Sequence, residues 1–333
     1  MEKTKIAVIG LGSVAQLVHL PNLMKIKNAE VTAVAEINKS RLNLVADKFN
    51  IKKRFHNYTE LLNDDHADAV IISTPTHLHK QIAVDCLTAG KDVLVEKPLA
   101  RNSAEGTEII ECAKKQKRKL MVGMNLRYRP DSMLIRSLID AGEIGDPYYI
   151  KCGWIRKQSS SEKWFNRREE AGGGVMLDLG INLVDLALWL ANFPNAISVS
   201  TKNYYHNSRK LEDTSISFIR CENSLTINIE ASWRMAAGKD TFFANVYGTK
   251  GSIGINPFKL IKMIDVEQID LGSTFSESPT EAFKKSYLNE LKSFIGAIRG
   301  INPVFSSGEE ALQLMKLTET MYKSSEKDQE IKI

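Results

Sequence analysis

The stretch that decides the fold is Lys5-Ile6-Ala7-Val8-Ile9-Gly10-Leu11-Gly12-Ser13-Val14-Ala15, a short apolar run that leads directly into a G-x-G-x-x-A motif. The apolar run predicts a buried strand, and the amphipathic segment 16–26 that follows it predicts a helix. Between such elements, Gly10 permits a tight turn, Gly12 lets the backbone approach a pyrophosphate, and Ala15 allows the helix to pack closely on the strand. The stretch therefore predicts a dinucleotide-binding turn. The alternative is an ordinary glycine turn of an α/β protein.

A second apolar run, residues 30–35, predicts the next strand, and Glu36 follows it. An acid at this distance from the glycine motif is expected to hydrogen-bond the adenosine ribose hydroxyls of a bound dinucleotide. Its negative charge would repel a 2′-phosphate, which favours NAD over NADP. Lys39 and Arg41 follow closely and could partly reverse that preference, so NADP stays possible. A solvated surface acid is the competing interpretation.

Strands and helices then alternate up to residue 124. The expected helices cover residues 39–49, 58–62, 78–89 and 103–117, and the expected strands cover 68–72, 93–95 and 120–123. Ser73-Thr74-Pro75-Thr76 closes one strand with small hydroxyl side chains and a proline, which suits a loop that passes over a dinucleotide. His77 and His79 open the following helix, where histidines are more often hydrogen-bonding groups than ligands. The alternation predicts a doubly wound parallel sheet, a Rossmann domain over residues 1–124.

The segment Val93-Leu94-Val95-Glu96-Lys97-Pro98-Leu99 ends one of these strands with a carboxylate, an amine and a proline. The carboxyl ends of parallel strands open onto the ligand crevice of such a sheet. Pro98 disfavours the helical conformation for the residue before it, so Lys97 is expected to be extended at the strand tip. Lys97 is then either a surface charge or a positioned proton-transfer group.

After residue 124 the pattern changes. A helix at 131–141 leads into segments with period-two alternation, and two helices at 281–299 and 309–323 follow them. The expected strands cover residues 148–154, 196–205, 214–220, 224–233 and 241–247. This pattern predicts an α+β domain over residues 125–333 with a mostly antiparallel open sheet. One face of such a sheet is available for a contact between subunits, in a homodimer or homotetramer.

Inside this domain, three glycines at 172–174 precede a mostly apolar segment that carries Asp178, Asn182 and Asp185. These positions are spaced so that on a helix they share one face. Polar groups on an apolar helix need partners or a cavity, which favours a ligand site. The alternative, of equal weight from this segment alone, is that Asp178 caps the helix and Asn182 is a satisfied core amide.

Composition excludes several classes of protein. With 333 residues, 43% hydrophobic and 26% charged, the chain is typical of a globular protein of two domains. The formal net charge of +5 comes without a long basic run, so we expect no nucleic-acid partner. The four cysteines are scattered and none has a histidine at metal spacing, so we expect neither disulfides nor a metal site. We find neither a signal-peptide pattern nor an apolar run close to a membrane span, which predicts a cytoplasmic protein without a membrane partner.

Together, these motifs resemble those of the family of glucose-fructose oxidoreductase, inositol dehydrogenase and the rhizopine-catabolism dehydrogenases (Gfo/Idh/MocA). Tyr247-Gly248-Thr249-Lys250-Gly251-Ser252-Ile253 is similar to a hairpin of that family's second domain, and Gly308-Glu309-Glu310-Ala311-Leu312 is similar to the start of its closing helix. The resemblance therefore spans nearly the whole chain. It implies a pyridine-nucleotide oxidoreductase that acts on a secondary alcohol or ketone of a sugar, cyclitol or sugar derivative.

The resemblance also implies roles for single residues. The family's lysine and the acid of its D-x-G-x-H motif match Lys97 and Asp178, but Asn182 stands where the family has histidine. Asparagine does not titrate, so it can hold a substrate hydroxyl or carbonyl but cannot act as a general base. We therefore expect Lys97 to carry the proton, while Asp178 orients its amine.

Two sets of contact residues complete the expected site. The residues expected to bind the cofactor lie in the glycine turn and at the strand ends: Gly10, Gly12, Ser13, Val14, Ala15, Glu36, Ser73, Thr74, Pro75, Thr76, His79, Glu96, Lys97 and Asn125. The residues expected to bind the substrate are Lys97, Arg127, Trp164, Arg167, Asp178 and Asn182. Arg127, Arg167 and Arg168 could form a mouth for a carboxylate or phosphate, or belong to a solvated charged loop. Trp164 either covers the substrate or packs in the core.

Two other functions stay open. Asn182 favours a non-catalytic sensor that has kept a dinucleotide site, whereas Glu96, Lys97 and Asp178 favour an enzyme. The other candidate is a glycoside hydrolase of the same family that uses tightly held NAD.

Overall fold

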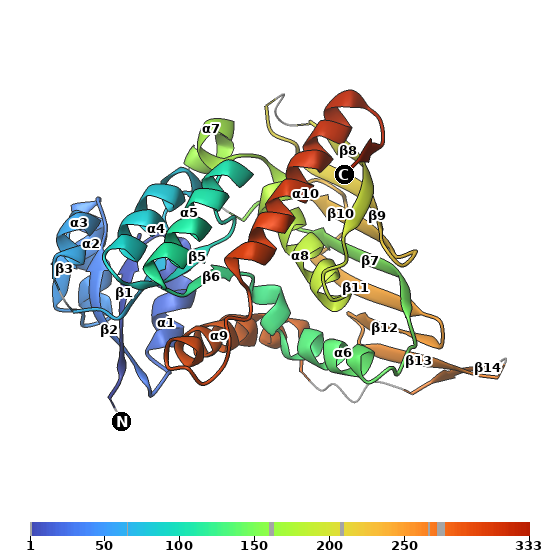
Figure 1. Ribbon diagram of the computed structural model, residues 1–333, viewed down its shortest axis with the longest axis horizontal. Helices are drawn as coiled ribbons and strands as arrows, with labels where there is room; N and C mark the ends of the chain where they lie inside the picture. Colours follow the sequence, from blue (N-terminus) through green and yellow to red (C-terminus); the bar gives the residue numbers. More distant parts are fainter. Residues whose placement is uncertain (1, 65, 160–162, 207–209, 266, 272–276) are drawn as a thin grey trace. The chain divides into compact units, whose positions relative to one another are not determined.

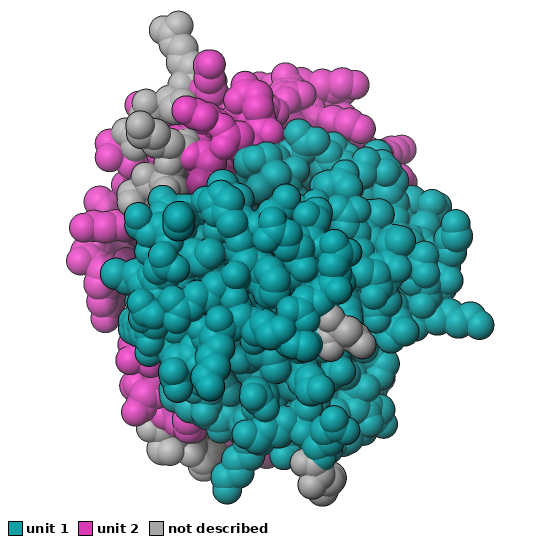
Figure 2. Space-filling model, turned by 90° about the vertical axis from the view of Figure 1, so that its left-hand side faces the viewer, with its two compact units in different colours: residues 1–124, 287–312 teal, residues 125–286, 313–333 magenta. Residues whose placement is uncertain are grey.

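The computed structural model describes residues 2–64, 66–159, 163–206, 210–265, 267–271 and 277–333. They form two compact units: residues 1–124 with 287–312, and residues 125–286 with 313–333 (Figure 2). The sequence predicts a second domain over residues 125–333, but residues 287–312 belong to the first unit. The reason is that the chain returns to the first sheet next to β6 (Leu120–Gly123). There, Ser306 Oγ donates a hydrogen bond to Val122 O, and Val122 N donates one to Ser306 O.

The first unit is built on a six-stranded sheet in the order β3-β2-β1-β4-β5-β6, with every neighbouring pair parallel (Figure 1). The strands are β1 (Thr4–Ile9), β2 (Ala29–Ala35), β3 (Lys53–Phe55), β4 (Ala69–Ile72), β5 (Asp92–Glu96) and β6 (Leu120–Gly123). The central strands are almost wholly buried, as in a parallel sheet that is covered on both faces. The predicted doubly wound sheet is confirmed.

Helices connect these strands and begin where the sequence supplies caps. They are α2 (Lys39–Lys48), α3 (Tyr58–Leu62), the short η2 (Thr76–Leu78) with α4 (His79–Thr88), and α5 (Ser103–Gln116). Asn38, Asn57 and Asn102 cap α2, α3 and α5, because each side chain accepts a hydrogen bond from a backbone N–H of the first turn.

The first helix differs from the expectation. Instead of one α-helix over 16–26, a π-helix, η1 (Ala15–His19), runs into the short α1 (Leu20–Leu23). Pro21 lies in the first turn of α1 and has no N–H with which to continue the ladder of the preceding turn. The irregular winding places His19 inside the unit, where it is completely buried.

The second unit contains a nine-stranded sheet in the order β14-β13-β12-β11-β7-β10-β9-β8-β15. The strands are β7 (Pro147–Ile155), β8 (Ala196–Tyr204), β9 (Thr214–Cys221), β10 (Thr226–Ser232), β11 (Thr241–Gly248), β12 (Gly251–Ile255), β13 (Lys259–Ile264), β14 (Glu267–Asp270) and β15 (Ile331–Lys332). Strands β7 and β10 pair in parallel, and the other described pairs are antiparallel. The predicted mostly antiparallel sheet is confirmed.

Helices cover one face of this sheet and leave the other open. The helical elements are η3 (Asn125–Tyr128), α6 (Pro130–Asp140), η4 (Lys163–Asn166), α7 (Arg168–Ala171), η5 (Met176–Gly180) and α8 (Ile181–Leu190), and α9 (Pro279–Ile298) and α10 (Gly308–Lys327) contribute residues to both units. Helix α8 packs against β7 and β10. Along β8 and β9, buried residues alternate with exposed ones, so the second face of the sheet is exposed.

One expectation about apolar segments needs correction. Residues Arg168–Leu190 have a mean hydropathy of 1.5 over their most apolar window, which is long and apolar enough to cross a membrane by composition alone. The expectation from the sequence was that no apolar run comes close to a membrane span. However, 94% of that window is buried inside the protein, as in the core helix of a globular domain.

Candidate active site

The glycine turn between β1 and η1 leaves space for a ligand at one glycine and none at the other. Gly10 has φ +86°, and a Cβ there would lie 2.8 Å from Ser73 O and 2.9 Å from Thr74 Cγ2, so the adjoining loop packs directly on it. A Cβ built on Gly12 meets no atom within 4 Å. Ala15 is buried against the sheet, while Ser13 and Val14 are exposed. An open cradle at Gly12 beside the start of a helix fits the pyrophosphate of a dinucleotide.

Glu36 lies at the end of β2 and is tied to this turn. Its Oε2 accepts a hydrogen bond from Leu11 N at 2.9 Å, and its Oε1 accepts one from Asn38 N at 2.9 Å. Arg41 Nη1 lies 3.6 Å from Oε2. Because an ionised carboxylate offers about four lone-pair positions, these contacts leave Glu36 able to accept a ribose hydroxyl as well.

The loop after β4 carries the small residues Ser73 to Thr76. Ser73 Oγ donates to Gly10 O at 2.8 Å, which binds this loop to the glycine turn. His79 is almost completely buried, with Nδ1 2.8 Å from Pro98 O and Nε2 2.9 Å from Thr74 O. Burial lowers the pKa of His79, against the two carbonyls that favour its protonated form. Since each ring nitrogen lies within hydrogen-bonding distance of a backbone carbonyl, His79 joins two loops, and its contact with a cofactor stays a prediction.

Glu96, the last residue of β5, is held by a histidine that the sequence analysis did not identify. His19 Nε2 lies 2.8 Å from Glu96 Oε1. Gly123 on β6 makes room for this carboxylate, because a Cβ there would lie 3.3 Å from Oε2. Burial alone would raise the pKa of Glu96, but the hydrogen bond from His19 and the charge of Lys97 outweigh it and hold the pKa below its ordinary value. Glu96 is therefore a carboxylate to which His19 Nε2–H donates.

Lys97 follows Glu96 at the tip of β5 and is half-buried. The peptide bond between Lys97 and Pro98 is cis. Through Glu96 and His19, the segment that carries Lys97 is joined to the helix that starts at the glycine turn.

In the second unit, Asp178 lies in the π-helix η5 and is almost completely buried. Its Oδ2 accepts hydrogen bonds from Trp233 Nε1 at 3.0 Å and from Ser159 N at 3.2 Å. Asp178 does not cap the helix, because the N-cap position of η5 is Val175. A carboxylate that is aimed by an indole N–H is a positioned polar group, not a helix cap.

Asn182 lies in the first turn of α8 and is 4% exposed. Its Nδ2 donates to the backbone oxygen of Asp178 at 3.2 Å. No donor among the described residues reaches its Oδ1, although that atom is buried. Asn182 is thus not the fully satisfied core amide that the sequence analysis kept as an alternative.

The glycines before η5 are held by a buried acid. Glu212 Oε1 accepts hydrogen bonds from Gly174 N at 2.9 Å, Met176 N at 3.1 Å and Tyr322 Oη at 2.7 Å. Burial raises the pKa of Glu212 in spite of these donors. A Cβ on Gly174 would collide with Glu212 O. The glycines therefore let the start of η5 lie directly on this acid.

Arg127 does not form part of a substrate mouth, contrary to the expectation. It is 1% exposed, and its Nε and Nη2 donate to the two carboxylate oxygens of Asp185 at 2.8 and 2.5 Å. Its guanidinium also lies 4.8 Å from the Phe193 ring centroid. A bidentate pair of this kind satisfies both charges inside the core, so Arg127 holds η3 to α8.

The other predicted contact residues are more accessible or differently engaged. Asn125 is buried, and its Nδ2 donates to Ser286 Oγ at 2.9 Å. Arg167 is exposed and pairs with Glu170 at 2.7 Å. Arg168 lies in the solvated charged segment that the sequence analysis considered, where it is within 3.5 Å of Glu326.

Trp164 belongs to a row of aromatic rings that leads to Asp178. Its ring centroid lies 5.3 Å from that of Phe165, and Phe165 lies 6.0 Å from Trp233. Trp233 in turn donates its N–H to Asp178. All three rings are only partly buried, so they can contact a ligand as well as one another.

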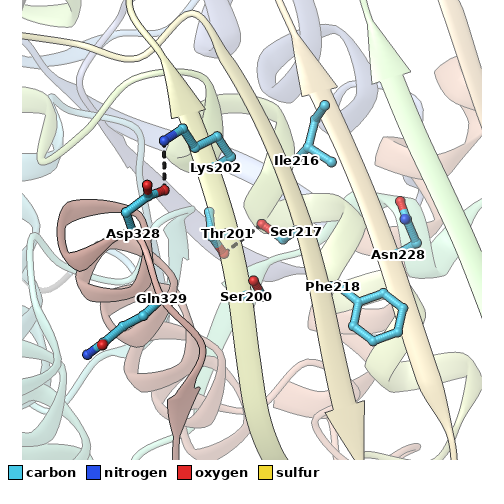
Figure 3. A pocket seen from close by; sticks show the side chains of 9 residues that line it. All are labelled: Ser200, Thr201, Lys202, Ile216, Ser217, Phe218, Asn228, Asp328 and Gln329. Atoms are coloured by element: carbon cyan, nitrogen blue, oxygen red, sulfur yellow. Dashed lines mark hydrogen bonds and ion pairs between the residues drawn. The ribbon is translucent and has the colours of Figure 1, made fainter.

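A pocket of about 280 Å³ lies on the open face of the second sheet, and none of the residues discussed above lines it. It is lined by residues of β8, β9 and β10 together with Asp328 and Gln329 (Figure 3). Two pairs of its polar groups are bonded to each other, Lys202 with Asp328 and Thr201 with Ser217. Across the part of the chain that the structure describes, no group of three histidine, cysteine or acidic side chains could hold a metal ion.

Comparison with protein families matches both halves of the chain. Residues 4–124 match the model of an oxidoreductase family with an NAD-binding Rossmann fold, and residues 133–254 match the C-terminal domain model of the GFO/IDH/MocA proteins. The two matches together cover well over half of the sequence.

Characterised relatives and a solved structure agree with these models. The chain is 30% identical to scyllo-inositol 2-dehydrogenase (NAD(+)) of Bacillus subtilis, over 94% of this chain and 91% of that protein. It is 28% identical to myo-inositol 2-dehydrogenase of Thermotoga maritima, over 99% and 98%. A crystal structure of a probable dehydrogenase from Thermotoga maritima covers 98% of each chain with a TM-score of 0.84 and 26% identity.

Proposed function

The chain belongs to the Gfo/Idh/MocA family of oxidoreductases, and from this premise we propose that it moves a hydride between NAD and a secondary alcohol or ketone of a cyclitol or sugar. The observation that carries the proposal is the link between Lys97 and the glycine turn. The strand tip that ends in Glu96 and Lys97 is hydrogen-bonded through His19 to the helix that follows the open cradle at Gly12. A proton-transfer group is thereby fixed to the element that would hold the dinucleotide.

Oxidation of a secondary alcohol removes a proton from oxygen and a hydride from carbon. Bound NAD⁺ supplies the hydride acceptor. In this chain the half-buried Lys97 takes the hydroxyl proton, and Asp178 and Asn182 hold the substrate. Asp178 is suited to this role because Trp233 and Ser159 fix its carboxylate. Asn182 cannot replace Lys97, since an amide does not titrate.

NAD is the preferred cofactor in this proposal. Glu36 is a buried carboxylate at the position that would meet the adenosine ribose, and its charge disfavours a 2′-phosphate there. The curated relative from Bacillus subtilis carries NAD(+) in its name, which supports the same choice. Arg41, 3.6 Å from Glu36, leaves some tolerance of NADP.

The test is NADH absorbance at 340 nm, with purified protein, NAD⁺ and a panel of inositols, aldoses, sugar acids and nucleotide-sugars. We expect absorbance to rise with one substrate class and to stay flat with Lys97→Ala. The binding of NADH is measured in parallel by fluorescence, so that loss of turnover can be distinguished from loss of the cofactor.

A second candidate function is a dinucleotide-binding sensor without turnover, because Asn182 cannot act as an acid or base. NADH binding with flat traces for all alcohols, and for the matching keto-sugars with NADH, would favour the sensor over the enzyme. Hydrolysis of a glycoside without release of free NADH would point instead to an NAD-dependent hydrolase.

We further propose a cytoplasmic homo-oligomer that assembles through the open face of the second sheet. Large apolar side chains lie exposed on strands of that face, including Tyr204 and Phe218 at 40% and Tyr247 at 37% exposure. Aromatic side chains are enriched where proteins contact one another, which favours this face as the subunit contact.

A further inference from the structure

The orientation of the Asn182 amide is fixed by its chemistry. The atom that faces it from η5 is the backbone carbonyl oxygen of Asp178, at 3.2 Å. A carbonyl oxygen only accepts hydrogen bonds, so the NH₂ group of Asn182 must point toward it. The amide therefore has its oxygen, Oδ1, turned away from η5.

That oxygen lacks a donor within the described parts of the protein. Asn182 is 4% exposed, and its Oδ1 is buried with no hydrogen-bond partner among the described side chains and backbone. Buried polar atoms in folded proteins nearly always have partners, so an exception calls for an explanation, and a bound ligand or water that completes the arrangement is one such explanation. The missing partner must be a donor.

The neighbouring polar group of the site is also an acceptor. Trp233 Nε1 and Ser159 N can only donate, so the Asp178 oxygen that they reach is accepting. Two acceptors on consecutive turns, the Asp178 carboxylate and Asn182 Oδ1, favour a molecule that presents hydrogen-bond donors to both.

We propose that Asn182 Oδ1 accepts a hydrogen bond from a substrate hydroxyl other than the one that is oxidised, so that the protein selects polyols bearing a free hydroxyl at that second position. A carbonyl, ether or fluorine there is disfavoured, because none of them donates. The proposal rests on the proposed function and adds to it a requirement on the substrate. A histidine at this position could donate or accept according to its tautomer, whereas Asn182 with its NH₂ committed can only accept.

The experiment uses the best polyol from the NAD⁺ panel and analogues in which one hydroxyl at a time is replaced by hydrogen, fluorine or methoxyl. Each is measured as kcat/KM with the wild-type protein and with Asn182→Leu, which keeps the side-chain size and removes the acceptor. The matched control is Asn203→Leu in β8, another buried asparagine of the second unit whose Oδ1 lacks a described partner.

We expect one hydroxyl position at which the deoxy and fluoro analogues lose about tenfold or more with the wild-type protein, since a lost bond of about 1.4 kcal/mol corresponds to tenfold. Asn182→Leu should lose a similar factor on the parent polyol and little further on those analogues. Non-additive losses at one position identify a direct contact. Asn203→Leu should keep the wild-type pattern.

Losses that add at every position would overturn the proposal, because Oδ1 would then be satisfied by water or serve only the fold. If Asn182→Leu does not fold, the analogue series with the wild-type protein decides alone, since equal rates for parent, deoxy and fluoro compounds at all positions exclude an essential donor. If no alcohol is oxidised, the proposed function fails, and the same series is measured as binding to the NADH complex by calorimetry. Failure of every polyol to bind would also overturn the acceptor role.

Discussion

Among single residues, Lys97 is the one whose proposed role depends most on the asparagine at position 182. With no histidine in the family position, we propose that Lys97 exchanges the proton with the substrate, since the Asn182 amide does not titrate. Replacing Lys97 by Met should lower kcat by about 10²–10⁴, the usual contribution of a positioned acid or base. NADH affinity, followed by fluorescence, should stay within a few-fold of the wild-type value. A Lys97→Met protein with an unchanged pH–rate profile would remove Lys97 from the mechanism.

In the proposed site, Glu36 is the residue that sets the preference for NAD over NADP. Glu36→Gln removes the charge that disfavours a 2′-phosphate and leaves Arg41 close by. We expect the ratio of kcat/KM for NADP to that for NAD to rise by about tenfold, as for one interaction of about 1.4 kcal/mol. Arg41→Gln should shift the ratio the other way. If Glu36→Gln leaves the ratio unchanged, the acid does not contact the ribose.

Glu96 predicts a pH dependence of stability. Its folded-state pKa is held below the ordinary value of 4.5, so its stabilising contribution is complete above pH 4.5 and is lost as the pH falls through the lowered pKa. Glu96→Gln should therefore lower Tm at pH 7, and the difference from the wild-type Tm should shrink as the pH falls below 4.5. The exposed Glu111→Gln is the control and should show no such trend. A Tm difference that stays constant with pH would contradict the assignment.

The candidate site residues that the sequence indicated are those with a local signature, and their roles stay predictions. Lys97 was identifiable between a glutamate and a proline, and Asp178 after three glycines, because their neighbours in the chain define the motif. His19 and Trp233 were missed because their partners lie 77 and 55 residues away. Arg127 was assigned wrongly for the same reason, since nothing near it in the chain indicates that Asp185 neutralises it in the core.

At the level of elements, the glycine turn contains a position, Gly12, where a substitution should weaken NADH binding without destabilising the fold. A Cβ on Gly12 meets no atom within 4 Å, so Gly12→Ala should leave the free energy of unfolding unchanged or raise it by about 0.4–1 kcal/mol. The same methyl group would fill the cradle for the pyrophosphate, and we expect NADH affinity to fall at least tenfold. Urea unfolding without cofactor and fluorescence titration measure the two quantities.

Gly10→Ala is the matched comparison and should behave in the opposite way. Its φ of +86° and the contact with Ser73 O at 2.8 Å make any side chain costly there. The conformational strain alone is about 1–3 kcal/mol. Equal free energies of unfolding for Gly10→Ala and Gly12→Ala would contradict the proposed difference between the two glycines.

Elements with strong periodicity were predictable, and those set by distant contacts were not. The apolar runs of β1, β4 and β5 gave clear strands, because a parallel strand buried on both faces needs such a run. The π-helices η1 and η5 leave no clear period in the sequence, because each is a single short segment that differs from an α-helix only in hydrogen bonds that span five residues instead of four. Asp178, Asn182 and Asp185 therefore do not form the single polar helix face that their spacing predicts. Asp185 pairs with Arg127, while Asn182 Nδ2 donates to Asp178 O.

For the whole molecule, the open face of the second sheet is the feature that the proposed chemistry does not use. A stable contact between subunits buries about 1,200–2,000 Å² and is centred on apolar and aromatic side chains. Phe218 lies on this face at the rim of the pocket between β8, β9 and β10 (Figure 3), and it is 40% exposed. It is the residue whose charge substitution should disrupt such a contact most directly.

Phe218→Glu should therefore convert the proposed oligomer into monomers without loss of folding, because the side chain points away from the core of its own unit. Light scattering after size-exclusion chromatography should give a multiple of 37.3 kDa for the wild-type protein and 37.3 kDa for the variant. Ile301→Glu, at a position 72% exposed in the first unit, introduces the same charge away from the sheet and should keep the wild-type mass. A wild-type protein that is itself monomeric, or a variant that keeps the full mass, would place the subunit contact elsewhere or exclude it. NADH formation by the monomeric variant would then show whether each chain carries a complete site, since no residue of the proposed chemistry lies on the open face.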